Sequence, residues 1–246
     1  MKVQIVPISI ILIVVTFALI PLITNGQKSD DPTDIRRGLL TERQRAHSKL
    51  YATRRQHSRK LTDFKEDEAE GEVRVTTGQE FGSSDDGSLF TLDDYAAKTA
   101  CESDVIVLAT AVAKESQLTP DETYVFTDYT FEIQKLLKND PSEPLASQGK
   151  IVVTRGGGRV KLDGRVITLT NASFKPIPVG AVCLLFLKRI PETDAYKTTD
   201  ASMLVGTDGV LTTLADPHRR AWLSGMTPQR AETLIENPVA PARCNR

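Results

Sequence analysis

The chain begins with an apolar segment that a folded soluble core does not readily accommodate. Residues 3–23 carry no charge and are interrupted only by Gln4, Pro7, Ser9, Thr16 and Pro21. At about 1.5 Å per residue, a helix of this length spans the roughly 30 Å hydrocarbon core of a bilayer. A surface helix of the same length would show a polar face, and this segment has none. The sequence therefore predicts that residues 3–23 insert into a membrane.

Two interpretations of this segment stay open. A cleaved signal peptide has a basic start, a shorter apolar region and small residues before the cleavage site. Lys2 supplies the basic start, but the apolar run is long and no A-x-A pattern follows it at residues 22–26. We therefore predict that residues 1–27 form an uncleaved signal anchor, a transmembrane helix, with secretion after cleavage as the alternative.

The orientation of the anchor is predicted from two opposing features. Lys28, Arg36, Arg37 and Arg43 follow the apolar segment, and the positive-inside rule would keep them in the cytoplasm. The first apolar segment of a chain commonly acts as an export signal, however, and the later sequence is typical of an exported β domain. We therefore expect a single-pass protein whose C-terminal domain is exported.

A charged region follows the anchor. Residues 28–60 contain ten Lys or Arg and four acids, whereas residues 63–86 contain nine acids and two bases. Such blocks, poor in large apolar residues, are typical of solvated linkers, so residues 28–88 are predicted to be a juxtamembrane stalk and linker. A polar helix is expected over residues 34–60, with His47 and His57 in it. The basic stalk could contact anionic lipid at about 1 kcal/mol per charge. The net charge of −1 gives no reason to expect nucleic-acid binding.

The β pattern dominates residues 89–236, which we predict to be a single mainly β domain with short flanking helices. Alternation and β-branched residues predict strands at 104–113, 124–137, 150–154, 160–170 and 179–188, with a further pair within 196–213. The most apolar of them, 179–188, is expected to be central. One helix is predicted to start at Thr91 and another at Thr227-Pro228, and the tail at 237–246 is expected to fray. Short strands separated by glycine turns indicate a small closed barrel or a sandwich.

A family resemblance favours the barrel. The pattern Cys101-x-x-Asp104-Val-Ile-Val-Leu-Ala-Thr-Ala-Val112, the strand beginning at Tyr124 and the apolar VGAVCLLFLK strand together resemble netrin-like modules. This group includes the tissue inhibitors of metalloproteinases, and the similarity covers residues 101–189. It implies a small OB-like β-barrel. In the inhibitors the inhibitory cysteine stands at the mature N-terminus, whereas Cys101 lies inside this chain, so the resemblance does not imply protease inhibition.

The three cysteines offer a disulfide rather than a metal site. Cys101, Cys183 and Cys244 are scattered and include no C-x-x-C pair, so no zinc site is predicted. Cys183 lies in the apolar strand and is expected to be an inert core residue. In an oxidising compartment a Cys101–Cys244 bridge would stabilise the fold by about 2–4 kcal/mol. Free thiols are the alternative.

Catalytic motifs are not found. His218 is the only histidine of the predicted domain, and no G-x-S-x-G or comparable nucleophile motif accompanies it, so we interpret it as a surface-loop residue. The Gly156-Gly157-Gly158 run precedes Arg159 rather than the Lys-Ser/Thr of a phosphate-binding loop, so it is predicted to be a turn. No catalytic, metal-binding or cofactor-binding residue is therefore predicted.

The basic surroundings of this turn are the best candidate for a binding site. Arg155, Arg159, Lys161 and Arg165 lie within eleven residues of each other. Barrels of this kind bind through their loops, so a protein or an acidic ligand could dock there. The leading hypothesis is a membrane-anchored, exported barrel with a binding or structural role. An exported hydrolase with an unrecognised site and a lipid-contacting membrane subunit are the competing hypotheses.

Overall fold

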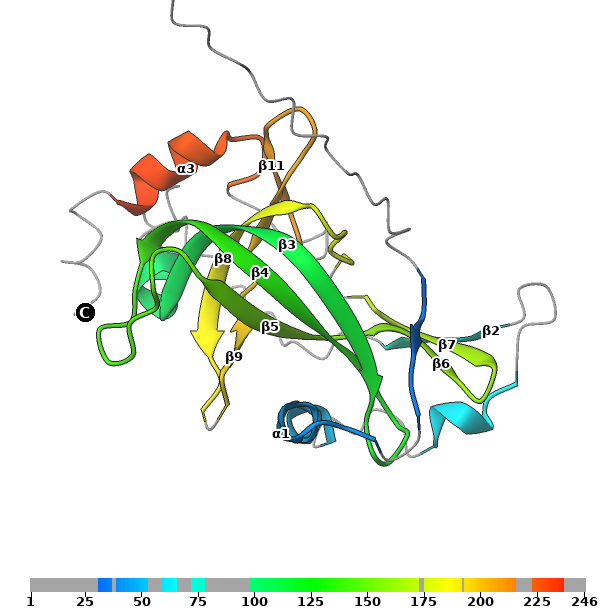
Figure 1. The fold of residues 1–246 in the computed structure, drawn as a ribbon. Helices are drawn as coiled ribbons and strands as arrows, with labels where there is room; N and C mark the ends of the chain where they lie inside the picture. The colour runs from blue at the N-terminus through cyan, green and yellow to red at the C-terminus, as the bar shows by residue number, and fades with distance from the viewer. Residues whose placement is uncertain are drawn as a thin grey trace, which may run out of the picture.

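The computed structural model describes residues 31–36, 39–52, 59–65, 72–77, 98–172, 175–191, 193–215 and 223–236. The predicted anchor at 1–27 and the tail at 237–246 lie outside these residues. Among the described residues, no helix is both long and apolar enough to span a membrane. The chain is mainly β, as the sequence predicts (Figure 1).

Two sheets make up the fold. The first has seven strands in the order β11-β10-β8-β3-β4-β5-β9, and a further β8–β9 pairing closes five of them into a ring. The strands of the ring are β3 (Val105–Leu118), β4 (Val125–Lys138), β5 (Lys150–Gly156), β8 (Val182–Arg189) and β9 (Ala195–Thr198), and β10 (Met203–Val205) and β11 (Leu211–Thr213) extend it. The ring is antiparallel except where β5 meets β9. The result is a barrel-like β fold.

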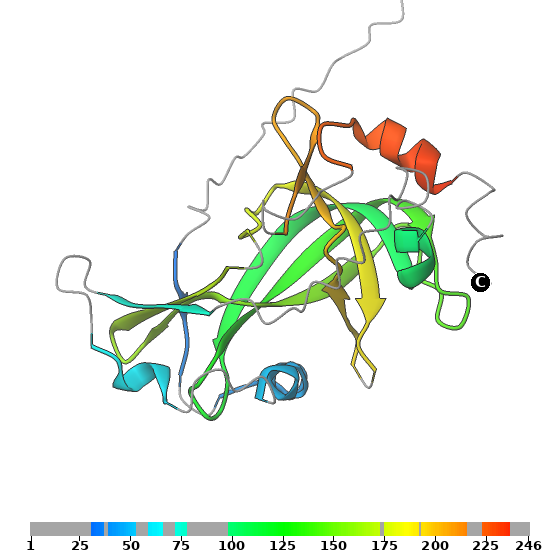
Figure 2. The ribbon, with the colours of Figure 1, turned by 180° about the vertical axis from the view of Figure 1, so that it is seen from behind.

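The second sheet lies beside the ring. Its order is β1-β6-β7-β2, and its strands are β1 (Thr33–Asp34), β2 (Glu72–Thr77), β6 (Gly158–Leu162) and β7 (Arg165–Asn171). The β6–β7 hairpin projects away from the ring in both ribbon views (Figures 1 and 2). Its two-residue turn places Asp163 and Gly164 at positive φ of 51° and 85°, which suits the twist of a tight hairpin.

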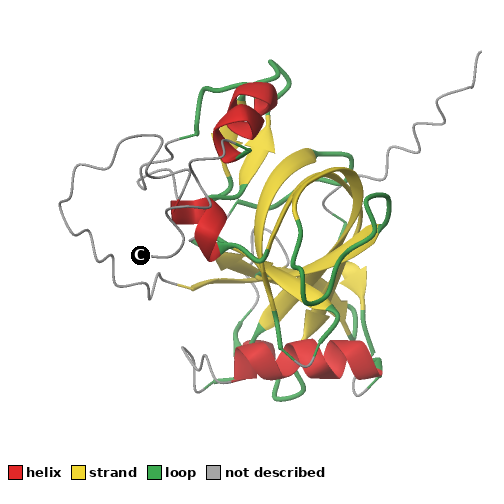
Figure 3. Ribbon diagram, turned by 90° about the vertical axis from the view of Figure 1, so that its left-hand side faces the viewer, coloured by secondary structure: helices red, strands yellow, loops and turns green. Residues whose placement is uncertain are grey.

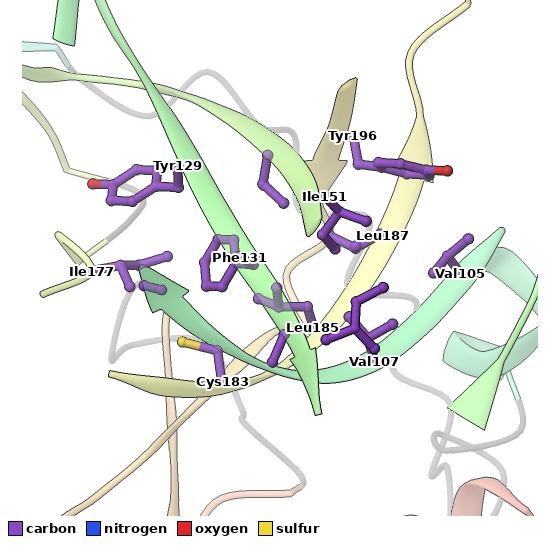
Figure 4. Close-up of a cluster of buried hydrophobic side chains, with 14 of the residues drawn as sticks. Val105, Val107, Tyr129, Phe131, Ile151, Ile177, Cys183, Leu185, Leu187 and Tyr196 are labelled. Carbon is purple, nitrogen blue, oxygen red and sulfur yellow. The ribbon is translucent and has the colours of Figure 1, made fainter. Parts of the chain in front are cut away.

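Alternation along the ring strands places apolar side chains on both faces. In β8, Cys183, Leu185 and Leu187 point into the interior of the ring, where they meet Phe131 of β4 and Val107 of β3 (Figure 4). The intervening residues of β8 belong to a second apolar cluster on the outer face. Because both faces of β8 are buried, its near-continuous apolar sequence is explained, and the prediction that it is central is confirmed.

Helices cover opposite ends of the ring. α3 (Pro228–Ile235) packs Ala231 and Ile235 onto the outer apolar cluster, while α1 (Glu42–Ala52) lies at the other end (Figure 3). The predicted start of α3 is correct, because the Thr227 hydroxyl accepts a hydrogen bond from the Arg230 N–H. Short helical segments also occur at 98–102 and at η1 (Leu61–Asp63).

The predicted stalk and linker at 28–88 is wrong where the structure describes it. β1 and β2 are sheet strands, Leu61 and Val73 are fully buried, and Tyr51 of α1 is buried in the same apolar cluster. Of the polar helix expected over 34–60, the described residues form a helix at 42–52, and residues 53–58 lie outside the described part of the chain. Charge-rich composition misled the prediction because a few apolar residues at the right spacing suffice to dock a segment against an existing apolar surface.

Candidate functional site

A cavity of about 350 Å³ lies where the two sheets meet, beside the triglycine corner between β5 and β6. Its lining comes from Asp31, from β2, β3, β4 and β7, from residues 155–159 around the corner, and from Lys175 and Pro176 after β7. The residues that line it therefore come from segments as distant in sequence as 31 and 176. A cavity of this volume is within the range of small-molecule sites.

Hydroxyl groups hold the corner in place. The Thr127 hydroxyl donates to the carbonyl oxygen of Gly157 at 2.7 Å and lies 2.9 Å from Ser116 Oγ. The Arg159 N–H donates to the same Ser116 oxygen at 3.4 Å, and Gly157 N–H donates to the Val125 carbonyl at 2.8 Å. These bonds tie the corner to β3 and β4. The predicted turn is thus the point at which the chain leaves the ring and enters the second sheet.

Positive side chains outnumber negative ones around the cavity. Among the described residues that line it, the carboxylates are Asp31 and Glu72, and the cationic residues are Arg74, Lys114, Arg155, Arg159 and Lys175. Glu72 is buried and forms ion pairs with Arg74 and with Arg159, the latter at 2.8 Å. Burial acts to raise the pKa of Glu72, but the hydrogen bonds from these two arginines outweigh it and hold the pKa below its ordinary value.

Arg155 is the buried cation of the site. Only 6 % of the residue is exposed, and its Nη1 donates a hydrogen bond to the Lys175 carbonyl oxygen at 3.2 Å. Burial lowers the pKa of Arg155, although a guanidinium stays charged at neutral pH even so. A buried charge next to a cavity is suited to binding an anion, because the interaction is stronger at low local dielectric constant.

The four basic residues predicted as one docking loop are divided by the structure. Arg155 and Arg159 line the cavity, whereas Lys161 is exposed on β6 and is not part of the lining. Arg165 donates to the carbonyl oxygens of Thr62 and Phe64 at 3.0 and 2.9 Å, so it holds the η1 segment against β7. Residues close in sequence separate here because β6 and β7 run as a hairpin.

Sequence reasoning missed the other cationic residues of the cavity. Lys114 lies on β3, one residue beyond the strand predicted at 104–113. Arg74 lies in the region predicted to be a linker, and Lys175 follows β7. Their sequence neighbours carry no motif, and no local pattern relates them. Only the pairing of β2 with β7 and the closure of the ring bring them together.

A second polar constellation joins α1 to the ring. His47 is fully buried; its Nδ1 lies 2.8 Å from Asp128 Oδ2 on β4, and its Nε2 lies 3.8 Å from Asp194 Oδ1. Within the described residues, neither His47 Nε2 nor Asp128 Oδ1 has a hydrogen-bond partner. The assignment of His47 to a solvated stalk is therefore wrong, since the helix face that carries it packs on β4.

The remaining sequence candidates have the following positions. Cys183 is buried and free, and burial raises the pKa of its thiol to about 12, in keeping with an inert core residue (Figure 4). Cys101 is disulfide-bonded, and its predicted partner Cys244 lies outside the described residues, as do His57 and His218. No group of three or more His, Cys, Asp or Glu side chains in the described part of the chain could hold a metal ion.

No protein-family model matches the chain, and no curated protein matches it at a significant level.

Proposed function

We propose that the protein is an exported, membrane-anchored binding module built on an oligonucleotide/oligosaccharide-binding type of barrel. The five-strand ring supports this barrel type, because such barrels are small five-stranded Greek-key structures. In this order β3, β4 and β5 form a meander, and β9 closes the ring in parallel with β5. The same order agrees with the resemblance of residues 101–189 to netrin-like modules.

Two features support the anchored and exported part of the proposal. Residues 3–23 are long enough and apolar enough to cross a bilayer. Cys101 is disulfide-bonded, and disulfides persist mainly in compartments outside the reducing cytoplasm. Both features favour a domain that works on the far side of the membrane.

The cavity at the triglycine corner is the observation that carries the binding role. It combines a volume of about 350 Å³ with a buried arginine, several hydroxyl groups and an apolar wall that includes Leu169 and Pro176. Ligand sites typically combine an apolar lining with a few fixed polar groups.

Filling the cavity tests the binding role. Thr170 is an exposed residue of β7 that lines the cavity, so Thr170→Trp is expected to occupy it without disturbing the core. Thr212→Trp, at an exposed position of β11, is the matched control. Ligand-observed NMR on the full chain in neutral nanodiscs would use phosphate, sulfate, dicarboxylates and neutral mono- and disaccharides as probes.

We expect at least one probe to bind the wild-type chain and Thr212→Trp, and to lose binding to Thr170→Trp. If no probe binds the wild-type chain, or if binding survives in Thr170→Trp, the cavity is not the binding site and the proposal fails.

A further inference from the structure

The described residues of the cavity lining carry a surplus of positive charge after the ion pairs among them are counted. The one buried carboxylate, Glu72, is already matched by Arg74 and Arg159. Lys114 and Lys175 then outnumber the remaining carboxylate, Asp31, which is exposed. Lys side chains are compact point charges that suit phosphate-like groups. The charge balance of the lining therefore favours an anionic ligand.

One hydroxyl of the lining has no hydrogen-bond partner among the residues that the structure describes. Thr168 lines the cavity, and its Oγ1 atom is buried and has no hydrogen-bond partner within the described residues. A buried hydroxyl left unpaired costs about 1–3 kcal/mol, which a ligand oxygen accepting its hydrogen bond would recover. This donor is an observation independent of the charge count, and it too is suited to an oxygen-bearing ligand.

The size of the cavity limits the ligand. At about 350 Å³ it falls at the lower end of small-molecule sites, so it holds a single small molecule or one headgroup. We propose that the cavity binds a phosphate or sulfate group, recognised by Lys114 and Lys175 with Arg155 and the Thr168 hydroxyl. This inference rests on the proposed binding function and adds the chemistry of the ligand.

Two sources could present this group. Asp31 lines the cavity, and residues 24–30 separate it from the apolar segment at 3–23. A fully extended chain covers at most about 3.6 Å per residue, so the cavity lies within about 29 Å of the end of that segment. A retained anchor therefore holds the cavity near the lipid headgroups. Both a soluble phosphate ester and a phospholipid headgroup carry the required anion.

Lysine substitutions test the charge recognition. Lys114→Gln and Lys175→Gln each remove one cation of the lining, whereas Lys161→Gln removes an exposed cation on the adjoining strand β6, outside the lining. Isothermal titration of the full chain in neutral nanodiscs would use inorganic phosphate and sulfate at constant ionic strength, with glucose as the neutral probe. We expect saturable binding of both anions to the wild-type chain. Lys114→Gln and Lys175→Gln should each lower the affinity about tenfold, because each removes one charge-assisted contact. Lys161→Gln should bind as the wild-type chain does.

The outcomes separate this inference from the proposed function. Absence of saturable phosphate and sulfate binding overturns the inference, as does an equal loss in Lys161→Gln, which would indicate nonspecific attraction. If a neutral saccharide binds and Thr170→Trp abolishes that binding, the binding function stands and only the anion assignment fails.

A second arm identifies the source of the anion. Vesicles containing phosphatidylglycerol would be added to the anion titration, with Lys114→Gln as the comparison. If the vesicles compete with free phosphate for the site, and if Lys114→Gln weakens this competition, the site is assigned to a lipid headgroup. Unchanged phosphate binding in the presence of vesicles assigns it to a soluble anion. Either result supports the oxyanion site and decides only its source.

Discussion

At the scale of single residues, His47 connects helix α1 to the ring through buried polar atoms. Its imidazole is fully buried, and Nδ1 lies 2.8 Å from the carboxylate of Asp128, a residue of β4. Gln44 supports the same contact region by donating from Nε2 to Glu115 of β3 at 2.9 Å. Buried polar groups are costly unless they are paired, so these two contacts select one docked position for the helix.

Replacing His47 by alanine is expected to destabilise the protein by about 3 kcal/mol. The substitution leaves the Asp128 carboxylate without its partner and opens a cavity under α1. Chemical denaturation of the full chain in neutral detergent measures the change. Lys49→Ala, an exposed position on the same helix, is the control and should change the stability by less than about 0.5 kcal/mol.

A double-mutant cycle with Asp128→Ala isolates the pair. We expect the two substitutions to be non-additive by about 1–3 kcal/mol. An effect of His47→Ala no larger than that of Lys49→Ala would show that α1 is not docked and would restore the solvated-stalk interpretation.

At the scale of elements, the corner between β5 and β6 decides where the two sheets separate. Gly158 has a positive φ of 150°, and a side chain there would overlap the hydroxyl groups of Thr127 and Ser116. Glycine is needed at this position for close approach as well as for its backbone angle. The triglycine run is therefore a packing feature that also forms one wall of the cavity.

Gly158→Ala is expected to destabilise the protein by about 3 kcal/mol, because overlap with two buried hydroxyl groups adds to the backbone strain. Gly164 also has a positive φ, of 85°, but nothing lies within 4 Å of the Cβ that Gly164→Ala would add. This substitution should cost only about 1 kcal/mol. Thermal unfolding of both variants measures the difference, and equal losses would rule out the packing role of Gly158.

Helix α1 shows which element boundaries the sequence could have indicated. Thr41 Oγ1 accepts from the Gln44 N–H at 3.2 Å, and Gln44 Oε1 accepts from the Thr41 N–H at 2.9 Å. This reciprocal pair is a capping box, and Thr41-x-x-Gln44 is its sequence signature. The thin apolar stripe among basic residues predicts a helix from residue 34, whereas the capping signature marks the observed start at Glu42.

At the scale of the whole molecule, segments before the barrel wrap around it. β1 pairs with β6 in parallel, and β2 pairs with β7 in parallel over six residues, Glu72 to Thr77. The region between the apolar segment and the ring thus contributes to both the second sheet and the cavity. An exported barrel of this kind would be held close to its anchor.

Export of the barrel is tested with a reporter enzyme that is active only outside the cytoplasm, fused after residue 246. We expect reporter activity in the membrane fraction, because residues 3–23 are apolar enough to be retained in the bilayer. Deleting residues 3–23 should abolish that activity. Export would be contradicted if the fusion is active only when it carries a reporter that works in the cytoplasm. Activity of the export reporter in the culture medium would indicate a cleaved signal.

Strand positions could be predicted well because their signal is local. Alternation in residues 124–137 places Tyr129, Phe131 and Ile133 on one face, and all three point into the ring interior. The apolar segment at 179–188 predicts a central strand, and β8 is central and buried on both faces. The cavity could be predicted only in part, through Arg155 and Arg159 next to the glycine run.

By itself, the sequence determined the mainly β class, the four ring strands β3, β4, β5 and β8, and the helix that begins after Thr227, because side-chain period and capping act over a few residues. Only the tertiary structure decided how the ring closes, where α1 docks and which residues line the cavity. The ion pair between Glu72 and Arg159 joins residues 87 positions apart, and the contact of His47 with Asp128 joins residues 81 apart. Contacts at such separations leave no pattern in either segment, since each depends on which strands pair once the chain is folded.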